Sequence, residues 1–371
     1  MKFTIQKRDI VDILSKIQGL TGRKSTLAAT SNVLIKASDA SVAITATDLE
    51  TGFEGIYPAA VETPGTVLLN SKKLYEIIRD FPEETVYVNK IENGWIQIGN
   101  ENVDYHLLGM SCEEFPLIPK IEDADYFSID SGVFKSMIEK SLAIGVSDEK
   151  RAHTNGVYLE RILTDKEKIL RMVSTDGSRL SKVDHIFDPS APVPEGPGLI
   201  VPKKGLAEVN KFLEEKGTVQ VGVKENHFIV KKESEIIIIR LLEGIFPKYS
   251  EIISKEGGKT IDLNRQRFIM MLKRMSILSS DDYKWVIFVI ENEKLAIHIT
   301  NPEIGESREE IAINYNGEPM KMAFNPRFFL DTLNVIDGED VRVTVICQER
   351  PCYIEDKDNP NYLSAIMPMR I

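Results

Sequence analysis

The sequence predicts an α+β protein made of three repeated domains, each with two helices packed on antiparallel sheets. Three segments share one pattern, a short alternating strand, a polar break and a helix, and they begin at Phe3, Phe127 and Ile261. Apolar residues in each of these helices fall at i, i+3 and i+4, which is typical of an amphipathic helix with one buried face. Period-2 alternation in residues 41–48 and 293–300 predicts antiparallel strands with one buried face.

Two further sets of matching segments extend the repeat. One set begins at the strand ends Leu69, Val201 and Phe324, and the other places a threonine after an apolar strand at Thr47, Thr175 and Thr300. Matches at three separated places in the same order are a poor fit to chance. Since each repeat contains two strand-to-helix transitions, we expect each domain to be a doubled βαβββ unit.

Each expected helix begins at a polar or Pro break after a strand, and the second helix of each repeat ends at a Pro- or Gly-containing turn. The six helices are expected at residues 7–18, 71–79, 131–144, 203–215, 264–277 and 326–334. Acidic residues near 122–125 and a Gly/Lys stretch near 255–259 indicate the domain boundaries. The predicted domains are residues 1–122 (N-terminal), 126–252 (central) and 258–371 (C-terminal).

Length and composition narrow the class of protein. The chain has 371 residues, 42% hydrophobic and 28% charged, so two or three folded domains are expected. No run of apolar residues approaches the ~20 residues of a membrane helix, and charges in residues 7–12 do not fit a signal peptide. Three scattered cysteines imply no disulfide framework. We therefore expect a cytoplasmic protein without membrane contact.

No catalytic or metal-binding motif stands out. The five histidines lack metal-ligand spacing, and no nucleophile or phosphate-loop motif is complete, so we expect no cofactor, no metal and no catalytic residue. One alternative is a nucleotidyl-transfer or hydrolytic enzyme with a site assembled from Asp48, Asp176 and His153. A weaker alternative is a sequence-specific DNA-binding protein, although no helix-turn-helix or zinc motif supports it.

The charges are distributed unevenly between the helices and the rest of the chain. The net charge is −11, yet the six expected helices carry 16 basic and 8 acidic residues. They therefore have a net charge of +8, and the remainder of the chain has −19. A solvated amphipathic face explains some of this excess, but glutamate favours helices as much as lysine does. Basic helix faces without a base-reading motif suit phosphate contacts that have no sequence preference.

With these features in place, the sequence resembles the bacterial sliding clamps, the beta subunits of DNA polymerase III. The resemblance rests on short segments in order along the whole chain. They are MKFTI at 1–5, TGRKSTLA at 21–28, TDLE at 47–50, NGVYLE at 155–160, TDGSRL at 175–180, VPKKG at 201–205, IFPKY at 245–249, FNP at 324–326 and MPMRI at 367–371.

The resemblance implies a head-to-tail homodimer whose six domains form a closed ring around duplex DNA. Such a clamp is non-catalytic and confers processivity on the replicative DNA polymerase. Its partners are the polymerase, the clamp loader, repair polymerases and other proteins with a clamp-binding motif. The size is compatible: a domain of about 120 residues is roughly 35 Å across, and six such domains leave a hole of roughly 35 Å. A B-form duplex is roughly 20 Å wide.

The resemblance also implies three sets of site residues. DNA-contacting residues are Arg23, Lys72, Lys150, Arg151, His153 and Lys203. Family members often carry tyrosines where this chain has Ala152 and His153. A pocket for partner peptides is formed by Thr154, Thr175, Gly177, Ser178, Arg179, Leu180, Pro247, Asn325, Phe328, Ile366, Met367, Pro368, Met369 and Arg370. In that pocket we expect an apolar floor formed by Leu180, Pro247, Met367 and Met369, with polar rims at Arg179 and Asn325. The dimer interface is formed by Lys73, Tyr105, Leu107, Ile277, Leu278, Glu306 and Glu309.

Overall fold

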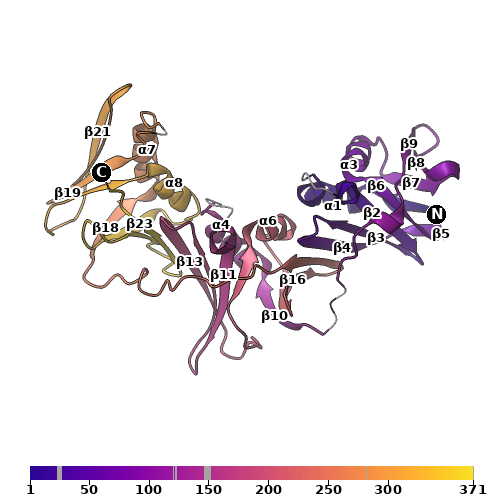
Figure 1. Ribbon diagram of the computed structural model, residues 1–371, viewed down its shortest axis with the longest axis horizontal. Coiled ribbons are helices and arrows are strands. Elements are labelled where there is room, and N and C mark those ends of the chain that lie inside the picture. The colour runs from indigo at the N-terminus through magenta and orange to yellow at the C-terminus, as the bar shows by residue number, and fades with distance from the viewer. Residues whose placement is uncertain (23–26, 120, 122, 146–151, 281, 371) are drawn as a thin grey trace. The chain divides into compact units, whose positions relative to one another are not determined.

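The computed structural model describes residues 1–371 apart from 23–26, 120, 122, 146–151, 281 and 371. The described part of the chain contains eight α-helices and 25 strands (Figure 1). All strand pairs within its four sheets are antiparallel, as the alternation predicts.

The doubled βαβββ unit is confirmed in all three repeats. The first repeat has β1 (Lys2–Gln6), α1 (Lys7–Lys16), α2 (Gln18–Thr21), β2 (Asn32–Ser38), β3 (Ser41–Thr47), β4 (Thr51–Pro58), β5 (Ala60–Thr63), β6 (Gly65–Asn70), α3 (Ser71–Asp80), β7 (Thr85–Lys90), β8 (Trp95–Gly99) and β9 (Asp104–Leu108). Strand β5 is an addition that the later repeats lack among their described residues.

The second and third repeats follow the same order. The second has β10 (Asp125–Asp130), α4 (Ser131–Leu142), α5 (Ala152–Asn155), β11 (Gly156–Leu163), β12 (Lys168–Thr175), β13 (Arg179–Phe187), β14 (Leu199–Pro202), α6 (Lys203–Phe212), β15 (Thr218–Lys224), β16 (His227–Lys232) and β17 (Glu235–Arg240). The third has β18 (Lys259–Asn264), α7 (Arg265–Ser276), β19 (Val286–Glu291), β20 (Lys294–Asn301), β21 (Gly305–Ala312), β22 (Met320–Phe324), α8 (Pro326–Asn334), β23 (Asp340–Val345), β24 (Cys352–Asp356) and β25 (Tyr362–Ile366).

Side-chain caps explain where several of the helices begin. The Oδ1 atoms of Asn70, Asn264 and Asn325 each accept a backbone N–H in the first turn of α3, α7 and α8, at 3.0 Å. An asparagine in this position satisfies a donor that has no partner within the helix. All six expected helices are present, and four of them end one to three residues earlier than predicted.

The chain divides into two compact units. Unit 1 comprises residues 1–135, 192–194 and 204–241, and unit 2 comprises residues 136–191, 195–203 and 242–371. Unit 1 has a five-stranded sheet, β5-β1-β7-β8-β9, and an eight-stranded sheet, β10-β15-β16-β17-β4-β3-β2-β6. Unit 2 has an eight-stranded sheet, β14-β11-β12-β13-β25-β24-β23-β18, and a four-stranded sheet, β21-β20-β19-β22. The central repeat is shared between the units because each half of it continues a sheet of a neighbouring repeat. The bounds of the three predicted domains stay a prediction.

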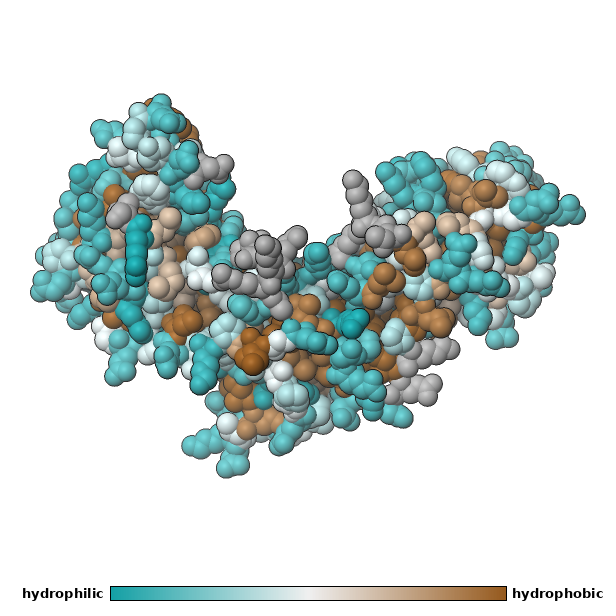
Figure 2. All heavy atoms as spheres, viewed as in Figure 1, coloured by the Kyte–Doolittle hydropathy of each residue, from teal (hydrophilic) through white to brown (hydrophobic). Residues whose placement is uncertain are grey.

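Buried apolar faces of helices and strands form the core of each unit. In unit 1 the α1 residues Ile10, Ile13 and Leu14 are at most 2% exposed, as the apolar stripe predicts. In unit 2 the Phe288 ring lies 5.0 Å from that of Phe329, between centroids. Figure 2 shows mainly hydrophilic surfaces with smaller hydrophobic patches interspersed. Every helix in the described residues is too short or too polar to cross a lipid bilayer.

Candidate functional site

A hydrogen-bonded turn joins β12 to β13 at residues 175–179 of unit 2. Thr175 Oγ1 accepts the Gly177 N–H at 3.1 Å and donates to the Arg179 carbonyl at 2.7 Å. Asp176 Oδ1 accepts the N–H groups of Ser178 and Arg179 at 2.9 and 3.1 Å. Gly177 has a φ of +90°, a left-handed conformation that glycine adopts without a steric cost. The sequence TDGSR therefore forms a rigid turn that brings four predicted pocket residues together.

Arg179 is held beneath this turn by two carboxylates and an aromatic ring. It is 8% exposed. Its Nε donates to Asp176 Oδ2 at 2.9 Å, and its Nη1 donates to Asp331 Oδ2 on α8 at 2.7 Å. Its guanidinium lies 4.3 Å from the centroid of the Phe328 ring, within the range of a cation–π interaction. The expectation that Arg179 forms a polar rim is wrong, because its side chain is buried and its charge is paired.

The predicted apolar floor lies beneath the segment that links the central and third repeats. Leu180 is 2% exposed and packs in a cluster with Phe246, Tyr353 and Ala365. Pro247, the next residue along the linking segment, is exposed. Leu180 is therefore part of the core under the site and does not contact a ligand, whereas exposed neighbours such as Pro247 can.

The C-terminal tail is both an exposed rim and a connection between two sheets. Ile366 is fully buried, whereas Met367 is 38% exposed. The Met367 N–H donates to the Ser178 carbonyl at 2.9 Å, and the Met369 N–H donates to the Ala323 carbonyl at 2.7 Å. A cavity of about 330 Å³ lies beside Pro368 and Met369. Removing the tail would therefore disturb the structure as well as the surface.

The other predicted pocket residues differ in how far they are exposed to solvent. Thr154 is buried at 0% exposure on α5, so it is not available to a ligand. Asn325 caps α8 and is half-buried, and Arg370 is exposed. Unit 2 thus places the turn, Phe328, Pro247 and the tail around one surface, with Arg179 and Leu180 as its support.

The predicted DNA contacts differ in their accessibility. Lys72 is exposed on α3, and His153 is half-buried on α5. Lys203 is only 4% exposed, and its Nζ donates to the Gly145 carbonyl at 3.2 Å. A buried ammonium is not accessible to a phosphate, so we remove Lys203 from the set. Burial also lowers the pKa of Lys203 to about 8. Arg23, Lys150 and Arg151 lie outside the described residues.

Much of the positive charge on the helices is paired. Lys140 is 6% exposed, and Arg274 forms a two-pronged ion pair with Glu309. Within the described part of the chain, five exposed basic residues on the helices have no recorded acidic partner. They are Lys72, Lys204, Arg267, Lys273 and Arg327. Their positions on helices were predictable from the sequence, whereas their exposure and lack of an acidic partner among the described residues are known only from the structure.

The predicted dimer residues lie on open sheet edges and a helix end. Tyr105 is 44% exposed on β9, an edge strand of unit 1, and Ile277 is 74% exposed just after α7 of unit 2. Glu306 is exposed on β21, which is also an edge strand. Leu107 and Leu278 are half-buried.

Two of the predicted dimer residues have partners within the chain. Lys73 bonds Glu76 on its own helix at 2.9 Å, and Glu309 bonds Arg274.

The carboxylates of Asp48 and Asp176, which the enzyme alternative requires, stabilise the turns in which they lie. Asp48 Oδ1 accepts the N–H groups of Glu50 and Thr51 at 3.1 and 2.7 Å, and Asp176 has the same role in its turn. A search of the described residues finds no group of three or more His, Cys, Asp or Glu side chains placed to hold a metal ion. The geometry of these carboxylates favours a structural role.

Comparisons with known families match the three repeats in order. A family model described as the DNA polymerase III beta subunit, N-terminal domain, matches residues 1–119. The central-domain model matches residues 128–248, and the C-terminal-domain model matches residues 250–370. The chain is 28% identical over 373 residues to the beta sliding clamp of Chlamydia pneumoniae, covering 100% of this chain and 99% of that protein. It is 28% identical over 374 residues to that of Pseudomonas aeruginosa, with 100% of each chain covered.

Solved structures of similar proteins have the same fold. The sliding clamp of Bacillus subtilis is 25% identical with a TM-score of 0.92, over 100% of this chain and 99% of that chain. The sliding clamp of Bartonella birtlesii, solved bound to griselimycin, is 27% identical with a TM-score of 0.93, over 100% of both chains.

Proposed function

The chain belongs to the DNA polymerase III beta subunit family, the bacterial sliding clamps, and we propose that two copies close into a ring around duplex DNA. It is a non-catalytic processivity factor with three clamp domains, and the comparisons along the whole chain carry that conclusion. The enzyme and the sequence-specific DNA-binding protein are therefore set aside. We place its action in the cytoplasm, where it binds DNA, the replicative polymerase, the clamp loader and other partners.

The sheet topology supports ring closure. Each repeat consists of two βαβββ halves. Strands β4, β13 and β21 are the last strands of the first halves, and β9, β17 and β25 are the last strands of the second halves. Within the chain β17 pairs with β4, and β25 pairs with β13. This leaves β9 and β21 as unpaired edges, which invite a further strand. Pairing β9 of one copy with β21 of the other completes the pattern.

The two internal junctions also predict the register of this pairing. The strand pairings can be followed residue by residue from the matching strands β1, β10 and β18 to β9, β17 and β25. They make Tyr105 equivalent to Ile237 and Ser364. In the same way, Ser307 is equivalent to Phe53 and Ser181.

The two internal pairings occupy the same register, because Ile237 lies opposite Phe53 and Ser364 lies opposite Ser181. We therefore expect Tyr105 of one copy opposite Ser307 of the other. In that register Asp104 lies opposite Arg308, which favours pairing by charge, and His106 lies opposite Glu306.

In this proposal the closed ring keeps the clamp on duplex DNA, and contacts between side chains and phosphates are of secondary importance. The five exposed cations on the helices, together with Arg23, Lys150, Arg151 and His153 from the resemblance, give phosphate contacts without sequence preference. Such contacts weaken as salt rises, because binding releases counterions. The clamp can therefore slide along DNA without leaving it.

Partner proteins dock through a short peptide on unit 2. We propose that the peptide lies along Phe328, Pro247 and Met367, with Arg179 and Leu180 fixed beneath them. Met367→Ala keeps the backbone hydrogen bond to Ser178 and removes an exposed apolar side chain. This variant should weaken stimulation of the polymerase. The control variant Ile186→Ala, which removes an exposed apolar side chain of β13, should not weaken it.

Retention on DNA tests the enclosure. Clamp placed by its ATP-driven loader on nicked circular DNA should persist through a high-salt wash and leave rapidly after the circle is linearised. Equal retention on both DNA forms would contradict a topological link.

Cross-linking tests the register of the seam. In a background with the exposed Cys347 replaced by serine, the pair Tyr105→Cys and Ser307→Cys should form disulfide-linked dimers. Directly opposite residues have Cα atoms about 4.5–5.5 Å apart, within the span of a disulfide. The control pair Leu107→Cys and Ser307→Cys is displaced by two residues and should link poorly. Preferential linking of the control pair would reject this register.

A further inference from the structure

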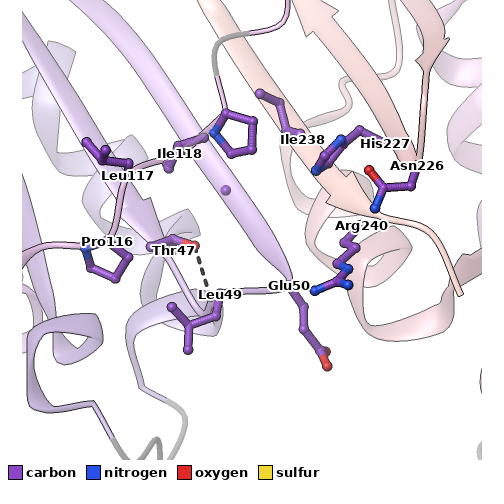
Figure 3. A pocket seen from close by; sticks show the side chains of 12 residues that line it. Thr47, Leu49, Glu50, Pro116, Leu117, Ile118, Asn226, His227, Ile238 and Arg240 are labelled. Carbon is purple, nitrogen blue, oxygen red and sulfur yellow. Dashed lines mark hydrogen bonds between the residues drawn. The ribbon is translucent and has the colours of Figure 1, made fainter.

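Unit 1 contains a cavity of about 300 Å³ beside the junction of β4 and β17 (Figure 3). Leu49 and Glu50 lie on one side in the turn between β3 and β4, and Leu117 lies on the segment after the first repeat. Ile238, Arg240 and His227 of β17 and β16 lie on the other side. The proposed function makes no use of this cavity.

The cavity occupies the position in unit 1 that the peptide-docking surface occupies in unit 2. The ladder registers make Gly52 equivalent to Leu180 and Arg240 equivalent to Met367. Pro116 lines the cavity in a Phe-Pro pair of the linking segment, as Pro247 does in unit 2. The backbone therefore repeats the same surface with different side chains.

The turns beside the two surfaces have the same hydrogen bonds. Thr47 Oγ1 accepts the Leu49 N–H at 3.0 Å and donates to the Thr51 carbonyl at 2.9 Å (dashed line to Leu49 in Figure 3). Asp48 Oδ1 accepts the N–H groups of Glu50 and Thr51. These bonds match those of Thr175 and Asp176 atom for atom. A rigid rim of the same shape therefore stands beside each surface.

Leu49 adopts a strained conformation at this rim. Its φ is +79°, where the equivalent residue of unit 2 is Gly177. A non-glycine residue in the left-handed region costs free energy, and such strain concentrates at binding sites. Leu49 is 52% exposed beside the cavity, and Leu117 is 99% exposed on the linking segment. Both are apolar side chains that a ligand could cover.

The polar side of the cavity is cationic. The Arg240 guanidinium points into the gap, whereas the Glu50 carboxylate points away from it (Figure 3). No ion pair of Arg240 is recorded among the described residues, although its backbone N–H donates to the Glu50 carbonyl at 2.8 Å. Partial burial lowers the pKa of His227, so this ring is neutral at neutral pH and adds no charge. The cavity therefore offers one positive charge beside an apolar wall.

We propose that this cavity is a second docking site, which binds a short peptide segment of a partner protein carrying an aliphatic or aromatic side chain next to a carboxylate. The apolar side chain lies against Leu49, Leu117 and Ile238, and the carboxylate pairs with Arg240. At the position of Arg240 the surface of unit 2 has Met367, and its Arg179 is already paired with two carboxylates. The two surfaces therefore place their charged and apolar side chains differently, and a clamp can hold two partners at once.

Binding of a defined peptide to the full-length clamp tests the proposal. The probe is a blocked hexapeptide with a Leu-Phe pair followed by Asp, and the control probe has Asn in place of Asp. Methyl NMR of the labelled clamp reports Leu49, Ile118 and Ile238 at the cavity, and Leu180 and Ile366 in unit 2. We expect the Asp peptide to shift the cavity methyls and the Asn peptide to bind about tenfold more weakly, since a charged hydrogen bond is lost.

Variants of the full-length clamp separate recognition from folding. Arg240→Gln should reduce binding of the Asp peptide to the level of the Asn peptide, whereas Lys231→Gln, an exposed lysine on the neighbouring strand, should not. Leu49→Gly should weaken binding several-fold without lowering the unfolding midpoint, because it relieves the strained conformation. Shifts confined to Leu180 and Ile366, equal binding of the two peptides, or full binding by either cavity variant would overturn the proposal.

Discussion

The junctions β4–β17 in unit 1 and β13–β25 in unit 2 have the same backbone but different side chains. Both are antiparallel in the same register, and both stand beside a Thr-Asp turn with the same hydrogen bonds. Unit 2 fills its junction with Leu180 and a clamped Arg179, whereas unit 1 has Gly52 and Thr51 at these positions. Repetition thus preserves the backbone hydrogen bonds, and side-chain volume and charge decide what each junction can bind.

The largest expected difference between the junctions concerns the buried arginine. Arg179→Ala removes the guanidinium that bonds Asp176, whose side chain is 7% exposed, and Asp331 loses the same partner. Breaking a buried ion pair costs about 3–5 kcal/mol of unfolding free energy, and exposure of Asp331 favours the lower end. The equivalent Thr51→Ala leaves the backbone hydrogen bonds of its turn in place and should cost about 1 kcal/mol. Denaturant unfolding of both variants checks this, and equal losses would contradict the contrast.

Leu180 and Gly52 test the contrast in packing. Leu180→Ala removes a fully buried side chain from the cluster beneath the linking segment and should destabilise unit 2 by about 3 kcal/mol. Gly52→Ala places a Cβ 2.8 Å from Ile118 Cγ2, the end of a side chain that can rotate away. We expect a loss below about 1 kcal/mol. Thermal unfolding followed by hydrogen exchange assigns each loss to its unit, and a larger loss for Gly52→Ala would reverse the interpretation.

Lys203 and its equivalent Ser71 predict a difference in pH dependence. Ser71 does not titrate in this range, whereas the pKa of Lys203 falls from 10.5 to about 8 in the folded chain because burial disfavours its charge. Between about pH 8 and 10.5 the unfolded chain keeps this proton and the folded chain has released it. Stability attributable to Lys203 therefore rises with pH across that window, by no more than about 3 kcal/mol.

The variant Lys203→Ser isolates this effect. The difference in unfolding free energy between variant and parent should shrink as the pH rises from 8 to 10.5, because the buried charge that the variant removes is neutralised in the parent. A difference independent of pH would show that Lys203 is not buried as a perturbed base.

The smallest expected effect comes from the left-handed residues of the two turns. Leu49→Gly should stabilise unit 1 by up to about 1 kcal/mol, and Gly177→Ala should destabilise unit 2 by a similar amount, because only glycine adopts this conformation without a steric cost. Unfolding midpoints of the two single variants check the opposite signs. Two changes of the same sign would mean that packing outweighs the backbone at one turn.

The repeat was readable from the sequence because its signals are local. The apolar stripe of Ile10, Ile13 and Leu14 and the caps at Asn70 and Asn325 lie within single turns of chain, and each predicted helix was found there. The site was only partly predictable. Arg179, Leu180 and Lys203 are buried by residues distant in sequence, such as Phe246 and Gly145, so their accessibility could not be read from neighbouring positions.

By itself the sequence determined the three βαβββ pairs, the strand alternation and the excess of positive charge on the helices, because hydrophobic period, capping and charge are properties of short segments. Only the tertiary structure decided which charges remain free, that the central repeat is shared between two sheets, and that two matching turns stand beside unlike surfaces. The reason is physical: burial and ion pairing depend on which segments pack together, and those contacts join residues far apart along the chain.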